Sequence, residues 1–153
     1  MAPLCVLVMR GAKGVAMPEI TTFLMFDGEA EEGMRFYISL CEQSETLSIS
    51  KRGPDQDGVE GTVRHATLTL SRQEFRAIDS AVKHGFTFAP VVSLYVRYDT
   101  EEEIDRLFGR LSQGGDVLTP LAAYPFEEKF SWVADRYSVS WQLSLAWPIS
   151  PWS

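Results

Sequence analysis

The sequence predicts an α+β fold in which two β-α-β-β-β modules pair and form a curved mixed sheet around a cleft. Strand and helix patterns alternate in the order β-α-β-β-β over residues 20–78, and the same order returns over residues 91–145. The length of 153 residues suits one domain of two small modules that share a core. Because neither module could bury its sheet alone, we expect them to pack together, with the helices outside and a ligand cleft inside.

The first module begins with a β-rich run, Ile20–Phe26, which ends at the turn pair Asp27-Gly28. Apolar residues spaced by three and four then predict an amphipathic helix over Glu29–Cys41, with acidic residues in its first turn. Alternating patterns predict three further strands at residues 46–51, 62–70 and 74–78.

The second module repeats this order after a strand at residues 91–98. Thr100 and Glu103 form a capping-box pattern, which predicts a helix over Glu101–Ser112 that is stopped by Gly114 and Gly115. Strands are predicted at residues 117–122, 129–134 and 138–145. Shifting the first helix so that Glu31 falls on Glu102 also places apolar residues on apolar residues, which favours an internal duplication.

The predicted organisation is an N-terminal extension (1–17), a first module (18–85), a second module (86–147) and a C-terminal tail (148–153). The apolar run Leu4–Met9 is short and follows no basic segment, so we expect no signal peptide. No apolar run approaches the ~18 residues that a membrane-spanning helix needs.

Charge and cysteine content exclude several classes of partner. The chain has 14 Lys and Arg residues against 21 Asp and Glu residues, and its net charge of −7 argues against binding to nucleic acid or to an anionic membrane. Cys5 and Cys41 are too few for a disulfide framework, and no CxxC pair suggests zinc. We therefore expect a cytoplasmic protein.

Several motifs resemble those of the PhnB-like family, also called 3-demethylubiquinone-9 3-methyltransferase-like. The motifs are Phe26–Glu32 followed by Phe36-Tyr37, His65-Ala66, Phe86–Phe88, Ser93–Val96, Glu102–Asp105 and Trp132–Gln142. The family belongs to the vicinal oxygen chelate superfamily, together with glyoxalases, bleomycin-resistance proteins and ring-cleaving dioxygenases. The resemblance covers residues 19–145 and implies a glyoxalase-like fold. The methyltransferase label finds little support, because no glycine-rich loop follows a strand to hold S-adenosylmethionine.

The chain departs from the family pattern near its C-terminal end. Ser138 stands where relatives usually have Gly, and Ala134 stands where they have Lys. Because Gly suits a positive φ, Ser138 predicts a changed turn.

The resemblance also implies where a metal would bind. Metal-dependent members of the superfamily use four inward His and Glu side chains, and the matching positions here are Thr22, Ala77, Ser93 and Gln142. None of these is a carboxylate or an imidazole, so they form a poor set of ligands for zinc, nickel or iron. We therefore expect no catalytic metal and no other cofactor.

Other side chains on the predicted strands could contact a ligand directly. Tyr95, Trp132 and Trp141 are expected to surround the cleft, with the Gln142 amide at its floor. His65 is the only candidate for a catalytic base, and its alternative interpretation is a half-exposed strand residue.

Three functions from different classes remain. The first is a metal-free binder of a small, partly apolar molecule. The second is a divalent-metal-dependent lyase, dioxygenase or transferase of the vicinal-oxygen-chelate type, and the third is a structural or regulatory homodimer with a filled cleft. In each case we expect a C2 homodimer, with Leu4–Met9 or Trp147 and Trp152 in its interface.

Overall fold

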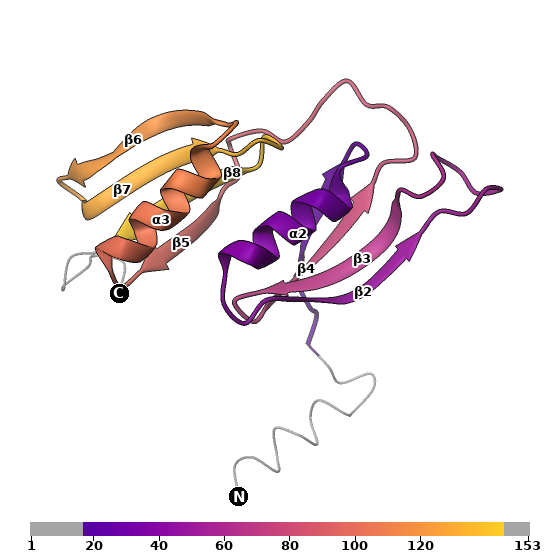
Figure 1. Cartoon of the computed structure of the whole chain (residues 1–153), viewed down its shortest axis with the longest axis horizontal. Helices are drawn as coiled ribbons and strands as arrows, with labels where there is room; N and C mark the ends of the chain where they lie inside the picture. The colour runs from indigo at the N-terminus through magenta and orange to yellow at the C-terminus, as the bar shows by residue number, and fades with distance from the viewer. Residues whose placement is uncertain (1–16, 146–153) are drawn as a thin grey trace, which may run out of the picture.

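The computed structural model describes residues 17–145, and both terminal segments that were expected in the dimer interface lie outside this range. The first module comprises β1 (Thr22–Phe26), α2 (Ala30–Leu40), β2 (Glu45–Lys51), β3 (Val63–Leu70) and β4 (Gln73–Asp79). The second comprises β5 (Leu94–Tyr98), α3 (Glu101–Ser112), β6 (Asp116–Tyr124), β7 (Glu127–Ala134) and β8 (Ser140–Leu145). The two modules lie side by side (Figure 1).

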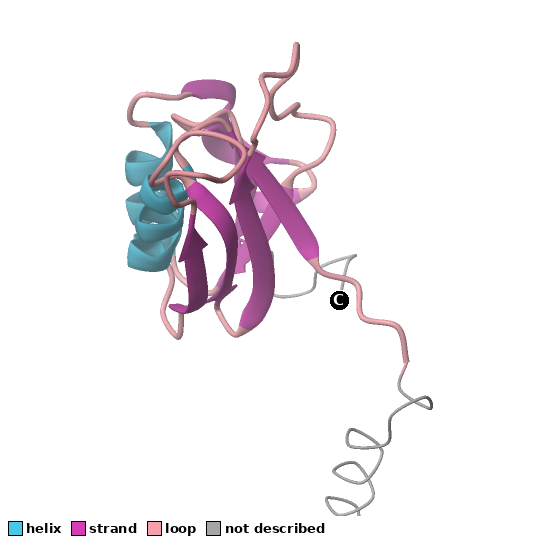
Figure 2. Cartoon of the chain, turned by 90° about the vertical axis from the view of Figure 1, so that its right-hand side faces the viewer, coloured by secondary structure: helices cyan, strands magenta, loops and turns pink. Residues whose placement is uncertain are grey.

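The two modules have the same topology. Their strand orders are β1-β4-β3-β2 and β5-β8-β7-β6, and each sheet contains one parallel pair, β1 with β4 and β5 with β8. Both helices cover the same side of the sheets (Figure 2). The paired β-α-β-β-β fold is confirmed, with two four-stranded sheets that form its mixed β-layer. We call the side of each sheet opposite its helix the open face.

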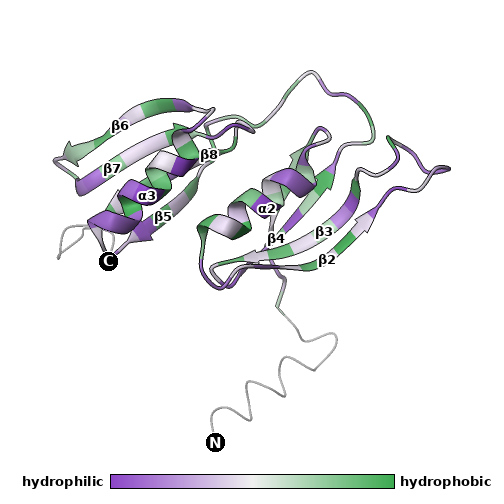
Figure 3. Cartoon of the chain, in the orientation of Figure 1, coloured by the Kyte–Doolittle hydropathy of each residue, from purple (hydrophilic) through white to green (hydrophobic). Residues whose placement is uncertain are grey.

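Both modules contribute to one hydrophobic core between the helices and the sheets. Met34 and Tyr37 of α2, Ile104 of α3 and Leu143 of β8 belong to the same buried cluster. Hydrophilic and apolar residues share each helix (Figure 3), because one side of the helix packs on its sheet while the other meets solvent. Within the described residues, no helix is both long and apolar enough to cross a membrane.

The two helices begin in different ways. The Thr100 hydroxyl accepts a hydrogen bond from the Glu103 backbone N–H at 3.2 Å, so the predicted cap of α3 is confirmed. The start of α2 has no cap from its own turn. Instead, buried Asp79 at the end of β4 accepts hydrogen bonds from the backbone N–H groups of Gly28 and Ala30.

The β7–β8 turn joins the second module to α2 through the buried carboxylate of Asp135. One of its oxygens accepts from the backbone N–H groups of Tyr137 and Val139, at 2.8 and 3.1 Å. The other accepts from the Tyr37 hydroxyl at 2.6 Å and from the Trp141 indole N–H at 2.9 Å. Because Tyr37 lies on α2, this carboxylate holds the two modules together.

Ser138 corrects an expectation about the same turn. Its φ is +72°, the left-handed conformation that Gly adopts most easily. Its backbone N–H donates to the carbonyl of Asp135 at 2.8 Å, which closes the turn. The turn therefore keeps a glycine-like backbone with a serine in it, because the hydrogen bonds around Asp135 hold that conformation.

Candidate functional site

A chain of hydrogen bonds crosses the open face of the second sheet. The hydroxyl of Ser93 accepts from the Gln142 amide nitrogen at 3.3 Å and lies 2.6 Å from the hydroxyl of Ser140. The Ser140 hydroxyl in turn accepts from the Trp132 indole N–H at 2.8 Å. Register explains the grouping, because Gln142 on β8 lies between Tyr95 on β5 and Trp132 on β7. The structure thus brings four of the seven predicted cleft residues together on one face.

A second polar group lies beside this chain. The Tyr95 hydroxyl donates to one carboxylate oxygen of Glu127 at 3.0 Å, and burial raises the pKa of this phenol. Glu127 is only 1% exposed, and its other oxygen has no hydrogen-bond partner. The Ser144 hydroxyl is also buried without a partner. A polar atom that is buried without a hydrogen-bond partner lowers the stability of the folded protein. We therefore consider this group a candidate for contact with a ligand that would supply the missing partners.

The sequence offered little sign of this second group. Glu127 lies next to a turn and belongs to none of the motifs described above. Ser144 is one of several serines in the last strand, and strand alternation alone would have placed it on the same face as Gln142.

Thr22 and Ala77 do not lie on the open face, and their expected place in the cleft is wrong. Thr22 shares the helix-facing side of β1 with Leu24 and Phe26, and Ala77 is fully buried in the core. The match between the two modules that the sequence predicts is wrong by one residue. A shift of one residue moves a strand side chain to the opposite face of its sheet.

The parallel ladders give the correct correspondence between the modules. The pair Thr22–Phe75 begins one ladder, and Leu94–Trp141 begins the other. Arg76, which is exposed, is therefore the counterpart of Gln142. By the same register, Thr21 is the counterpart of Ser93.

Two other predicted residues also lie away from this group. Trp141 is 2% exposed and packs on the ring of Tyr37 at 5.2 Å between centroids, so its predicted place in the cleft is wrong. Successive residues of a strand point to opposite faces of the sheet, so the Trp141 side chain faces the helices whereas Gln142 lies on the open face. His65, the candidate base, is exposed on β3 of the first sheet and pairs with Ser50 of β2.

The residues at these positions do not fit a divalent metal. Ser93 and Gln142 bind each other, and their counterparts are a threonine and an arginine whose positive charge would repel a cation. Across residues 17–145, no three His, Cys, Asp or Glu side chains gather closely enough to hold a metal ion. No catalytic step through a metal can be derived from this arrangement.

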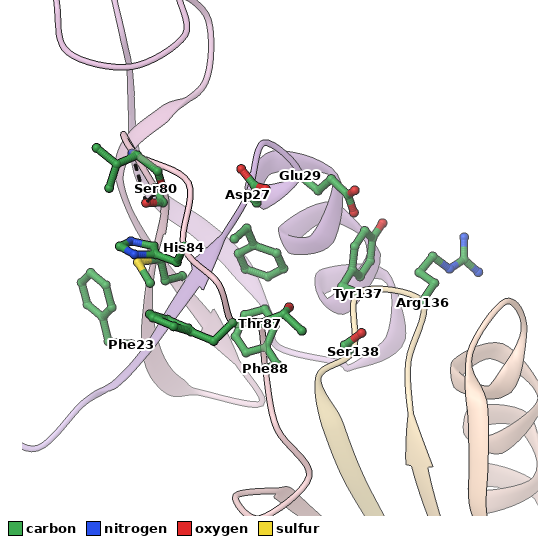
Figure 4. Close-up of a pocket in the computed structure, with 14 residues that line it drawn as sticks. Phe23, Asp27, Glu29, Ser80, His84, Thr87, Phe88, Arg136, Tyr137 and Ser138 are labelled. Atoms are coloured by element: carbon green, nitrogen blue, oxygen red, sulfur yellow. Dashed lines mark hydrogen bonds between the residues drawn. The ribbon is translucent and has the colours of Figure 1, made fainter.

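A cavity of about 390 Å³ lies where the two modules and their linker meet, and we call it the seam cavity (Figure 4). Its lining comes from β1 with the turn after it, from the linker over 80–88, and from the β7–β8 turn. His84 belongs to this lining and stacks on Phe86 with ring centroids 4.8 Å apart. No local pattern groups these residues, because they come from three segments that lie far apart in the sequence.

Comparison with known proteins places this fold in a family. The family model for 3-demethylubiquinone-9 3-methyltransferase matches residues 18–144. The chain belongs to this family. The PhnB protein from Bacillus cereus is 59% identical, with a TM-score of 0.83, over 84% of this chain and 100% of that chain. The resemblance drawn from the sequence motifs is therefore confirmed.

More distant structures show the fold alone. A glyoxylase/bleomycin resistance protein/dioxygenase domain from Frankia sp. EAN1pec is 15% identical, with a TM-score of 0.61, over 87% of this chain and 95% of that chain. The fosfomycin resistance protein FosX from Listeria monocytogenes, in complex with Mn(II), is 9% identical, with a TM-score of 0.57, over 86% and 95% of the chains. A search of curated proteins finds no match.

Proposed function

We propose that the protein binds a small, partly apolar molecule on the open face of the second sheet, without a resident metal ion. The observation that carries this proposal is the pair of buried, unpartnered oxygens on Glu127 and Ser144, beside the hydrogen-bonded chain around Gln142. A ligand that donates hydrogen bonds would pair these oxygens, and the carboxamide oxygen of Gln142 could accept one more donor.

The aromatic side chains at this face favour a ligand with a flat apolar part. Tyr95 is 46% exposed, and Trp132 is half-buried with its indole N–H already bonded to Ser140. Their rings are therefore fixed at one edge and free to stack on a planar molecule. A metal-dependent lyase, dioxygenase or transferase would need carboxylate or imidazole ligands that this face lacks, so we favour binding over metal catalysis.

The proposal is tested by thermal-shift screening of a metabolite library, followed by calorimetric titration of each hit. We expect a metal-independent hit whose affinity falls about tenfold in Gln142→Leu or Glu127→Gln, the cost of one or two hydrogen bonds. Gln113→Leu, at the exposed end of α3, is the matched control and should bind normally. The proposal would be refuted if the hits bind only with added nickel, manganese or iron(II), or if their affinity is unchanged in both variants.

We also propose that the protein is a C2 homodimer in which the partner covers the edge strands β2 and β6 and leaves the ligand face open. Large apolar side chains remain exposed on these strands, including Leu47 at 50% and Leu118 at 43%. An isologous contact would cover each of them twice. Sedimentation should give about twice the monomer mass of 17.2 kDa, and Leu47→Asp should shift the protein toward monomer. A 17.2 kDa species at micromolar concentration would refute the dimer.

The proposed location is the cytoplasm. Cys41 is a free thiol, and burial raises its pKa, so it stays protonated and unreactive as a structural cysteine would. A reducing compartment suits such a chain.

A further inference from the structure

The seam cavity has the size of a ligand site and lies apart from the hydrogen-bonded chain on the second sheet. Its volume of about 390 Å³ falls within the range of small-molecule pockets. Both modules and the linker contribute to its walls, so it exists only when the modules are packed together. Figure 4 shows the lining side chains, which come from these three segments.

One wall of the seam cavity is aromatic. Phe23 and Met25 of β1 face Phe86 and Phe88 of the linker, and Phe88 packs edge-on against Phe26 with centroids 5.2 Å apart. Phe86 is 68% exposed even though His84 stacks on it. An exposed aromatic surface of this kind suits a flat apolar body, and aromatic faces also attract organic cations.

The polar rim of the cavity is acidic. Asp27 and Glu29 both line it, and neither carboxylate takes part in an ion pair or a side-chain hydrogen bond with any described residue. Arg136 also contributes to the lining, but its guanidinium lies over the ring of Phe36, 4.5 Å from the centroid. Figure 4 shows this side chain pointing away from the other lining residues. The charges left to face a ligand are therefore the two carboxylates.

We propose that the seam cavity binds an organic cation, an amine carried on a flat apolar body. The aromatic wall would hold the apolar body, and the carboxylates of Asp27 and Glu29 would attract the ammonium group. An anionic ligand would meet two like charges at the rim. The hydroxyls of Ser80, Thr87 and Ser138 line the same cavity and offer acceptors for ammonium protons. This site is independent of the one proposed on the second sheet.

Three indoles that differ only in charge provide the test. Tryptamine is a cation, tryptophol is neutral and indole-3-acetate is an anion, so titration of each into the full-length protein isolates the charge contribution. We expect tryptamine to bind about tenfold more tightly than tryptophol, and indole-3-acetate to bind most weakly. Amide shifts of Thr87 and Phe88 on adding tryptamine should locate the binding at the seam cavity.

Two variants separate charge from shape. In Asp27→Asn/Glu29→Gln, the tenfold preference for tryptamine should fall to about one, whereas Asp116→Asn/Glu128→Gln, on exposed strand positions, should keep it. Phe86→Ala leaves the carboxylates in place and should weaken tryptamine and tryptophol alike. Equal binding of tryptamine and tryptophol to the wild type, or an unchanged preference in the Asp27/Glu29 variant, would overturn the proposal. Failure of all three indoles to bind would overturn it as well.

Discussion

Replacing Asp135 should test how the two modules are held together. The Asp135→Ala substitution leaves four donors without an acceptor: the Tyr37 hydroxyl, the Trp141 indole and the backbone N–H groups of Tyr137 and Val139. Asp135 is 3% exposed, so water cannot readily replace it. Hydrogen bonds to a buried charge are worth about 1.5–3 kcal/mol each, and part of that loss is recovered by relaxation. We expect the free energy of unfolding to fall by about 4–5 kcal/mol.

Asp135→Asn should cost less, about 2 kcal/mol, for a geometric reason. Its amide oxygen can still accept from the two backbone N–H groups, and the Tyr37 hydroxyl can turn to accept from the new amide NH₂. The indole of Trp141 only donates, so it faces another donor and loses its bond.

Urea denaturation followed by tryptophan fluorescence measures these losses. Asp116→Ala, at the exposed start of β6, is the matched control and should change stability by less than about 0.5 kcal/mol. Tyr37→Phe combined with Asp135→Ala should show a coupling of about 1 kcal/mol, because both changes remove the same bond. If the free energy of unfolding of Asp135→Ala lies within about 1 kcal/mol of the wild-type value, the carboxylate does not join the modules as described.

Three further predictions concern the backbone at Ser138 and Gly115 and the side chain of Tyr137. Ser138→Gly should raise the free energy of unfolding, measured in urea, by about 1 kcal/mol, because a φ of +72° strains any residue that carries a Cβ. An unchanged free energy of unfolding would show that serine adopts this conformation here without strain. Gly115→Ala should lower the free energy of unfolding by more than about 2 kcal/mol, since its new Cβ would collide with the Ala134 carbonyl oxygen. Gly53→Ala is the control and should be nearly neutral, because a Cβ there meets open space. Equal effects of the two substitutions would contradict this packing. Burial raises the pKa of Tyr137 from the ordinary tyrosine value of about 10 to about 12. The stability that this side chain contributes is therefore present below about pH 10 and is lost as the pH rises through about 12. Between about pH 10 and 12, the free energy of unfolding should depend less on pH in Tyr137→Phe than in the wild type. The same dependence on pH in both proteins would show that Tyr137 does not contribute in this way.

Local patterns in the sequence predict most of the fold. The Thr100 and Glu103 pattern marks the start of α3, and the structure has this helix at the predicted residues, Glu101–Ser112. The first strand of the second module begins at Leu94 rather than residue 91, because the segment before it belongs to the linker and forms no ladder. Such boundaries depend on which residues find a strand partner, and local sequence does not contain that information.

The candidate site was harder to predict, because it depends on register and on contacts between distant residues. Ser93 and Gln142 were grouped correctly from motifs, whereas a shift of one residue moved Thr22 and Ala77 to the wrong face of their sheet. Asp135 binds Tyr37 across 98 positions of sequence, and no local pattern reveals such a bond. The same limit applies to the seam cavity.

The different caps of the two helices also bear on the order in which the chain folds. Thr100 lies one residue before α3, so the start of this helix can form as soon as its own turn forms. Helix α2 receives its acceptor from Asp79, which lies 49 positions after Ala30 and in the last strand of the module. The beginning of α2 therefore gains its stabilising contact only after β4 has joined the sheet, and closing that long loop costs entropy first. Although the two modules share one topology, α3 is set up to nucleate locally, whereas the start of α2 is a late event of folding.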